Sequence, residues 1–150
     1  MAAEPRLTAR VEASPEGLRE AAATLDRFEA AQGVDPESAW PVHVALDEVL
    51  SNVVRHGAAG PRTVLIEVTF AAIGDHLEVV VEDDGPALNP LTLPAPDTAA
   101  PLEARQPGGL GVHLVRNLMD RVSYTRDGDR NRLVFARRLR PARRPDAPKE

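Results

Sequence analysis

The chain has 150 residues, a formal net charge of −5, 43% hydrophobic and 27% charged residues, which is the composition of one globular domain. It contains no cysteine, so disulfides, thiolate chemistry and cysteine-ligated zinc or iron–sulfur sites are excluded. The four histidines show no metal-ligand spacing, and no apolar run approaches the ~20 residues of a membrane helix. The N-terminal residues also lack the basic-then-apolar order of a signal peptide, so we expect a cytoplasmic protein.

Charge is distributed unevenly along the chain. Residues 136–150 hold six Arg or Lys against two acids, whereas the rest of the chain is acidic. Such a basic segment can contact an acidic partner or nucleic acid, but a solvated terminus has the same composition. We therefore expect one domain over residues 1–140 and a basic, proline-rich, disordered tail over 141–150, to which we assign no function.

A strand and a helix are predicted before Gly33. Apolar and polar residues alternate from Leu7 to Ala13, which is the period-two pattern of a strand with one face on a core. Ser14 followed by Pro15 is typical of a helix N-cap with proline at the first helical position. Apolar residues then recur at helical spacing up to Gly33, which predicts the first helix.

A second helix is expected to start near Ser38. Pro41 is tolerated only in a first turn, where backbone N–H groups have no intrahelical partner in any case. Apolar residues form one stripe from Val42 to Val54. Gly57 is predicted to end the helix as its C-cap.

Two strands and a proline-rich segment follow the second helix. The strands are predicted over residues 63–70 and 76–82, and the short Ile73-Gly74-Asp75 connection favours an antiparallel hairpin. From Pro86 to Pro107 lie six of the chain's fourteen prolines, with little periodicity. This length and composition indicate either a functional lid or a disordered insert.

The last elements complete an α+β order. Residues 108–111 open a third helix, and strands near 122–126 and 131–139 flank Asp127-Gly128, a signal for a type I′ hairpin turn. Hairpin-joined strands that alternate with three helices predict a two-layer α/β sandwich. We expect one mixed, mostly antiparallel sheet with the helices on one face.

A polar row borders the apolar stripe of the second helix. Glu48, Asn52 and His56 follow one another at i, i+4 and i+8, which places their side chains in line along one side of the helix. Such a row can be an ordinary helix edge that meets water. It can also be one wall of a polar site.

Two further segments have a composition suited to a nucleotide. Asp83 ends a strand, and its ionised carboxylate, which only accepts hydrogen bonds, could receive the amine of adenine and reject the oxo group of guanine. Asp-Asp-Gly is equally a plain turn sequence. The glycines of residues 108–112 would let a helix N-terminus approach phosphate, although a glycine-rich helix start can also be only a connection.

Taken together, these segments carry a family resemblance over about residues 7–139. The order HVALDEVLSNVVRHG, VVVEDDGP, a loose loop and GGLGVHLVRNLMDRVSY resembles the GHKL, or Bergerat-type, ATP-binding fold of gyrase-type ATPases and histidine-kinase catalytic domains. More narrowly, it is similar to the stand-alone anti-sigma-factor serine/threonine kinases of bacterial partner-switching systems. No single segment is specific by itself, whereas the full order is.

The resemblance implies roles for individual residues. Glu48 would be the general base or the carboxylate that orients water, and Asn52 would be both a cofactor contact and the Mg²⁺ ligand through its side-chain oxygen. Asp83 would read adenine, and Gly85 would leave backbone room beside the base. The segment against the ATP phosphates would consist of Gly109, Leu110, Gly111 and Val112, with the two glycines closest.

The same resemblance makes residues 86–107 the ATP lid. The wider superfamily has Asp-x-Gly-x-Gly at the start of this segment, whereas this chain has Ala87 in place of the second glycine. This departure weakens the hinge of the lid but not the adenine contact. His56 matches the family's His-Gly helix ending, for which a capping or packing role is favoured over catalysis.

Length directs the functional hypothesis. We expect 150 residues to leave no room for the phospho-accepting hairpin of a histidine kinase or the transducer of a gyrase-like machine, so the acceptor would lie on another protein. The leading hypothesis is an ATP- and Mg²⁺-dependent serine/threonine kinase that acts as an anti-sigma factor, or a similar regulator, and phosphorylates an antagonist. The alternative is a non-catalytic, ATP-gated module that sequesters its partner. A homodimer is possible, and we expect no direct contact with nucleic acid or membrane.

Overall fold

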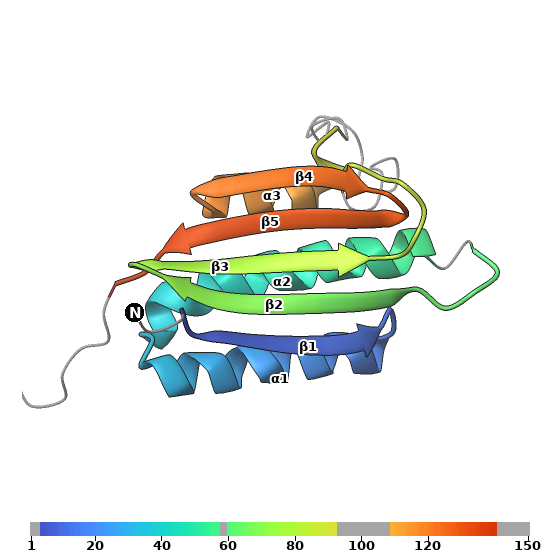
Figure 1. The fold of residues 1–150 in the computed structure, drawn as a ribbon. Helices are drawn as coiled ribbons and strands as arrows, with labels where there is room; N and C mark the ends of the chain where they lie inside the picture. The colour runs from blue at the N-terminus through green and yellow to red at the C-terminus, as the bar shows by residue number, and fades with distance from the viewer. Residues whose placement is uncertain (1–3, 58–59, 93–108, 141–150) are drawn as a thin grey trace, which may run out of the picture.

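The structure is a computed structural model that describes residues 4–57, 60–92 and 109–140, with the backbone only at 109–112. Its described elements form two layers, with a five-stranded sheet in one and three α-helices together in the other (Figure 1). In chain order the elements are β1 (Arg6–Glu12), α1 (Pro15–Gln32), α2 (Pro36–Gly57), β2 (Leu65–Ile73), β3 (His76–Asp83), the 3₁₀ turn η1 (Pro90–Thr92), α3 (Gly109–Leu118), β4 (Arg121–Asp127) and β5 (Arg130–Arg138).

The expected α+β sandwich is confirmed. The strand order is β1-β2-β3-β5-β4, and all four neighbouring pairs are antiparallel, so the described sheet contains none of the parallel pairing that a mixed sheet would allow. β1 reaches β2 after two intervening helices, and β5 lies between β3 and β4. This order sets the end of β3 against the start of β5, with Asp83 opposite Asn131.

Both hairpin turns depend on a glycine. Gly74 and Gly128 occupy the first central position of their turns with φ of 61° and 60°, and no described non-glycine residue has a positive φ. The predicted hairpins are confirmed, but the predicted type I′ turn at Asp127-Gly128 is wrong. A type I′ turn requires positive φ at both central residues, whereas Asp129 keeps a negative φ, as in a type II′ turn.

α1 begins and ends as its sequence indicates. The Ser14 hydroxyl accepts a hydrogen bond from the Gly17 N–H at 3.1 Å, and Pro15 occupies the first helical position. Gly33 closes the helix in the left-handed conformation, with its N–H directed to the carbonyl of Glu29. Both ends therefore satisfy backbone groups that a helix terminus leaves without intrahelical partners.

α2 begins at Pro36, two residues before the predicted start at Ser38. Asp35 provides the cap, because its side chain accepts the Glu37 N–H at 3.3 Å and its carbonyl accepts the Ala39 N–H at 3.0 Å. Pro41 consequently lies in the second turn rather than the first. The Asp35-Pro36 pair repeats the capping chemistry of α1. This pair, and not the position of Pro41, determines where α2 begins.

Gly57 ends α2 for a steric reason. It has no positive φ, so it is not a left-handed cap, and a Cβ at this position would lie 2.8 Å from a methyl group of Val64. Because residue 57 has no Cβ, Val64 can lie close against the end of the helix. No helix in the described part of the chain is both long and apolar enough to cross a bilayer.

The core lies between the sheet and the helices. Phe28 of α1 packs against Phe70 of β2, with ring centroids 6.3 Å apart, and Phe135 of β5 is also fully buried. The inward residues of the strands alternate with polar ones, as the period-two pattern requires. The core supplies a rigid support for the end of β3.

A charged contact joins α1 to α2 on the helical layer. The Nε2 atom of His43 lies 2.7 Å from a carboxylate oxygen of Glu29 and 3.5 Å from one of Asp26. The hydrogen bond to Glu29 raises the pKa of His43 above its ordinary value of 6.5, against the opposing effect of burial, and the charges of Glu29 and Asp26 add to the increase. Protonation of His43 therefore stabilises the packing of the two helices.

The first prediction is a pH-dependent contribution from His43. Because its folded-state pKa lies above 6.5, the contribution is complete below that pH and disappears as the pH rises through the raised pKa. As the pH rises from about 6 to about 9, the free energy of unfolding of the unmodified chain should fall by on the order of 0.5–1 kcal/mol through this contact. His43→Gln should not show this fall. Urea denaturation at both pH values measures it. Identical pH dependence in the two proteins would exclude this role.

Candidate functional site

A pocket opens beside α2 at the end of β3. Its lining is mainly apolar, with a few polar side chains that converge from α2, β3 and β5, which is the usual form of a small-molecule site. The lining residues are Glu48, Val49, Asn52, Val53, His56, Gly57, Val81, Asp83, Gly85, Pro86, Leu88, Pro90, Leu91, Val115, Val122, Tyr124, Asn131 and Leu133.

The polar row of α2 forms one wall of this pocket. Glu48, Asn52 and His56 all line it, so the row is not simply a helix edge against open solvent. Asn52 is buried, Glu48 is half-buried and His56 is exposed. Helix geometry explains the arrangement, because residues four apart lie above one another on the same side.

The side-chain oxygen of Asn52 already attracts a cation. It accepts a hydrogen bond from the guanidinium of Arg55, one turn further along α2. A buried amide oxygen that faces a cationic donor fits the chemistry of a Mg²⁺ ligand, since that ion prefers oxygen. The buried amide oxygen therefore fits the Mg²⁺ ion that the family resemblance implies.

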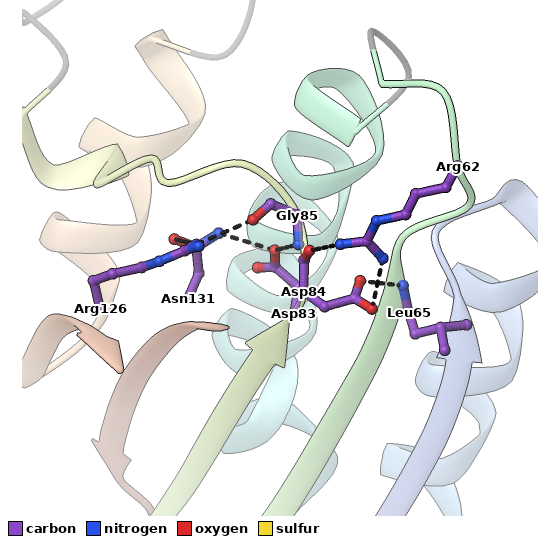
Figure 2. Close-up of polar contacts among 7 residues, drawn as sticks. All are labelled: Arg62, Leu65, Asp83, Asp84, Gly85, Arg126 and Asn131. Atoms are coloured by element: carbon purple, nitrogen blue, oxygen red, sulfur yellow. Dashed lines mark hydrogen bonds and ion pairs between the residues drawn. The ribbon is translucent and has the colours of Figure 1, made fainter. Parts of the chain in front are cut away.

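Asp83 is the buried carboxylate of the pocket, with only 5% of its surface exposed. Its Oδ1 atom accepts hydrogen bonds from the Gly85 N–H at 2.9 Å and from Nδ2 of Asn131 at 3.0 Å (Figure 2). Among the described residues, no hydrogen bond to Oδ2 is found. One oxygen is thus held by the protein, and the other remains to accept a donor from a ligand.

The neighbouring Asp84 serves the fold instead. Its carboxylate accepts the Leu65 N–H at 2.9 Å and lies 3.0 Å from the guanidinium of Arg62, which also donates to the Asp84 carbonyl at 2.6 Å (Figure 2). The Leu65 hydrogen bond and then Arg62 lower the pKa of Asp84, although partial burial acts against them. The Asp-Asp-Gly sequence therefore combines a pocket carboxylate with a structural one.

Gly85 leaves space for the carboxylate of Asp83. A Cβ at this position would lie 3.0 Å from Oδ1 of Asp83 and 3.4 Å from a methyl group of Val64. The close approach that requires glycine here involves the protein's own side chains. Whether Gly85 also gives room to a base remains a prediction.

The predicted phosphate segment lies at the start of α3. Gly109, Leu110, Gly111 and Val112 form its first turn, and their side chains are outside the described part of the structure. Of the predicted lid, residues 93–107 also lie outside it. The described remainder follows the pocket from Pro86 and ends in η1, where Asn89 accepts hydrogen bonds from the N–H groups of Leu91 and Thr92.

No motif in the sequence indicates three polar residues that reach the site from the β4–β5 hairpin. Tyr124 and Asn131 line the pocket, and Arg126 donates to the Gly85 carbonyl at 3.0 Å (Figure 2). The pairing of β3 with β5 brings Asn131 there, and the pairing of β5 with β4 adds Tyr124 and Arg126. The sole sequence signal is the placement of Asn131 just after a hairpin turn, at a buried strand position.

The family profile and the relatives that match this chain point to the same family. The profile of the family described as histidine kinase-like ATPase domain matches residues 11–137. Serine/threonine-protein kinase BtrW of Bordetella bronchiseptica is 30% identical, over 63% of this chain and 67% of its own length. Serine-protein kinase RsbW of Oceanobacillus iheyensis is 30% identical, over 75% of this chain and 74% of its own length.

A solved structure shares the fold. The crystal structure of the RsbU and RsbW domains of Rv1364c from Mycobacterium tuberculosis superposes with a TM-score of 0.64 at 23% sequence identity. The match covers 93% of this chain but 34% of that longer one. The likeness therefore concerns one part of the larger protein.

The second prediction compares the contribution of Asp84 to stability with that of an acidic residue on the surface. Its lowered pKa means that its contribution to stability is present above about pH 3.8 and is lost as the pH falls through the lowered value. At neutral pH, Asp84→Asn should lower the free energy of unfolding by about 1 kcal/mol, whereas Asp129→Asn in the exposed turn should change it by less than about 0.5 kcal/mol. Chemical denaturation compares the two variants. Equal effects would contradict the structural role of Asp84.

Proposed function

Because the chain belongs to the family of histidine kinase-like ATPase domains, we propose that its pocket binds ATP and that it is a serine/threonine protein kinase. The acceptor hydroxyl would be supplied by a partner protein. The relatives BtrW and RsbW, which are named serine or serine/threonine protein kinases, support this reading.

The geometry of Asp83 carries the proposal. The buried carboxylate lines an apolar pocket, and the donors that the described residues offer to it occupy Oδ1 alone. The free oxygen suits the amine of adenine, because a carboxylate accepts but cannot donate. The oxo group of guanine would instead set one acceptor against another, which is unfavourable in a buried site.

Two side chains of α2 would assist the transfer of the γ-phosphate. We assign the bound Mg²⁺ to the amide oxygen of Asn52, in place of Arg55, and when bound this ion would neutralise charge on the phosphate oxygens. Glu48 would accept the proton of the partner's Ser or Thr hydroxyl. The hydroxyl oxygen then bonds to the γ-phosphorus, the bond to the bridging oxygen breaks, and ADP leaves.

The regulatory context of the proposal is a partner switch. The sequence resembles anti-sigma-factor kinases, so we propose that the protein binds a sigma factor or a similar regulator and phosphorylates an antagonist that competes for it. An acceptor on a separate protein agrees with the open, partly exposed wall that Glu48 and His56 form.

One contact favours a second candidate function. Arg55 occupies the oxygen of Asn52, and if it remains there with ATP bound, Mg²⁺ does not reach this ligand. The protein would then be a non-catalytic, ATP-gated module that sequesters a regulatory partner. Phosphoryl transfer to the partner distinguishes the two functions.

The third prediction concerns the choice of nucleotide. At a hundredfold excess over its Kd, ATP should stabilise the chain by ~2.7 kcal/mol, which is several degrees in Tm, and GTP should not. Asp83→Asn should abolish the ATP shift. Because Gly85 and Asn131 both donate to the oxygen at Oδ1, the new amide would direct its NH₂ group to the base and set donor against donor. Thermal unfolding measures the shifts, and equal shifts with GTP would remove Asp83 from its role.

The fourth prediction separates chemistry from binding on α2. Glu48→Gln should keep ATP affinity and slow phosphoryl transfer by roughly 10²–10⁴-fold, because a general base acts in the transition state. Asn52→Ala should weaken Mg²⁺-dependent ATP binding as well as transfer. The exposed neighbour Asp47, which does not line the pocket, offers the control Asp47→Asn.

The measurements are ATP affinity and transfer of labelled γ-phosphate to a partner protein that copurifies with the chain. Wild-type transfer by Glu48→Gln with normal ATP binding would reject the catalytic assignment. The binding module would then be the better account.

A further inference from the structure

We propose that Asn131 is a positioning residue for base recognition, because its side chain holds the carboxylate of Asp83 in the orientation that reads the 6-amino group. The inference rests on the proposed binding of an adenine nucleotide in the pocket. It adds a residue from β5 that neither the motifs nor the family resemblance indicates.

Asn131 lies directly behind the carboxylate. It occupies the start of β5 opposite Asp83 in the register of the sheet, and 7% of its surface is exposed. Its Nδ2 atom donates to Oδ1 of Asp83 at 3.0 Å and to the carbonyl of Pro86 at 2.8 Å. Both hydrogens of the amide are therefore used, one on the carboxylate and one on the segment that follows it.

The partners of Asn131 fix which way its amide faces. Its Oδ1 atom accepts from the Tyr124 hydroxyl, from the Arg126 guanidinium at 3.2 Å and from the Leu88 N–H at 3.3 Å. A guanidinium and a backbone N–H can only donate, so the oxygen has to face them and Nδ2 has to face Asp83. The contacts at Oδ1 of Asn131 thus orient its Nδ2 donor toward Asp83.

The same hairpin holds the chain as it leaves β3. Arg126 donates to the carbonyl of Gly85 at 3.0 Å (Figure 2). It also donates to the carbonyl of Gly128 at 3.0 Å, and so links the segment after Asp83 to the β4–β5 turn. Together with Asn131 it contacts four successive points of this segment. These are Oδ1 of Asp83, the carbonyls of Gly85 and Pro86, and the N–H of Leu88.

Oδ1 of Asp83 therefore accepts two donors, one from β5 and one from the segment that Arg126 of β4 holds. A carboxylate held at one oxygen by a backbone N–H and a buried amide cannot rotate about its last bond without breaking both hydrogen bonds. Oδ2 is then presented in a single direction. Preorganisation of this kind favours a ligand that has a donor at that one position over a ligand that lacks it.

Asn131→Asp is the sharpest variant of this contact. It keeps the size of the side chain and an oxygen for Tyr124, Arg126 and Leu88, but it replaces the Nδ2 donor with an acceptor facing Asp83 and Pro86. Asn117→Asp, on the exposed side of α3, makes the same chemical change away from the pocket and is the matched control.

The experiment compares the Kd of ATP with that of the analogue in which hydrogen replaces the 6-amino group, both with Mg²⁺. The unmodified chain and Asn117→Asp should prefer ATP by at least about tenfold, the effect of one hydrogen bond to a charged acceptor. In Asn131→Asp this preference should fall to within about threefold while the Kd of the analogue changes by less than about threefold. A purely structural role would instead weaken both nucleotides equally.

An unchanged preference in Asn131→Asp, or an equal loss for both nucleotides, would overturn the proposal. If thermal unfolding shows that this variant does not fold, Asn131→Ala decides, because it removes the Nδ2 donor to Asp83 without adding a charge. Its preference for ATP should fall by about threefold or more, and an unchanged value would overturn the role of Asn131. No preference for ATP in the unmodified chain would instead reject adenine recognition by Asp83 itself.

Discussion

The antiparallel pairing of β3 with β5 sets Asp83 opposite Asn131, and the pocket depends on this one register. Side-chain direction alternates along a strand, so a shift of β5 by one residue would turn Asn131 to the other face of the sheet, away from Asp83. The pairing in turn needs β5 to lie between β3 and β4. A sheet with its strands in sequence order would have placed β4 there and separated the carboxylate from its donor.

Charge is divided between two neighbouring carboxylates. Asp84 is paired with Arg62 and accepts a backbone N–H, whereas the donors to Asp83 within the described residues are both neutral. A cation beside Asp83 would occupy the oxygen that a ligand needs. At the other wall Arg55 supplies a positive charge to Asn52, which is where a metal and phosphates would bring their own charges.

Local signals in the sequence were sufficient for most of the fold. The N-cap at Ser14, the end of α1 at Gly33 and the two hairpins follow from backbone chemistry within a few residues, and these elements are confirmed. The structure begins α2 at Pro36 rather than near Ser38, because Asp35 caps the helix and Pro41 is tolerated in its second turn. Asn131 could not be predicted, since its function arises from a contact 48 residues away in the chain.

The central claim is that ATP occupies the pocket between α2 and the end of β3. Amide hydrogen exchange with and without Mg²⁺-ATP tests it most directly, because binding slows exchange where it suppresses local opening. The account predicts slower exchange in the second half of α2, from Glu48 to Gly57, and from Asp83 to Leu91, with no change around the His43 contact at the opposite end of α2. Slower exchange confined to the region of His43, or none anywhere, would contradict it.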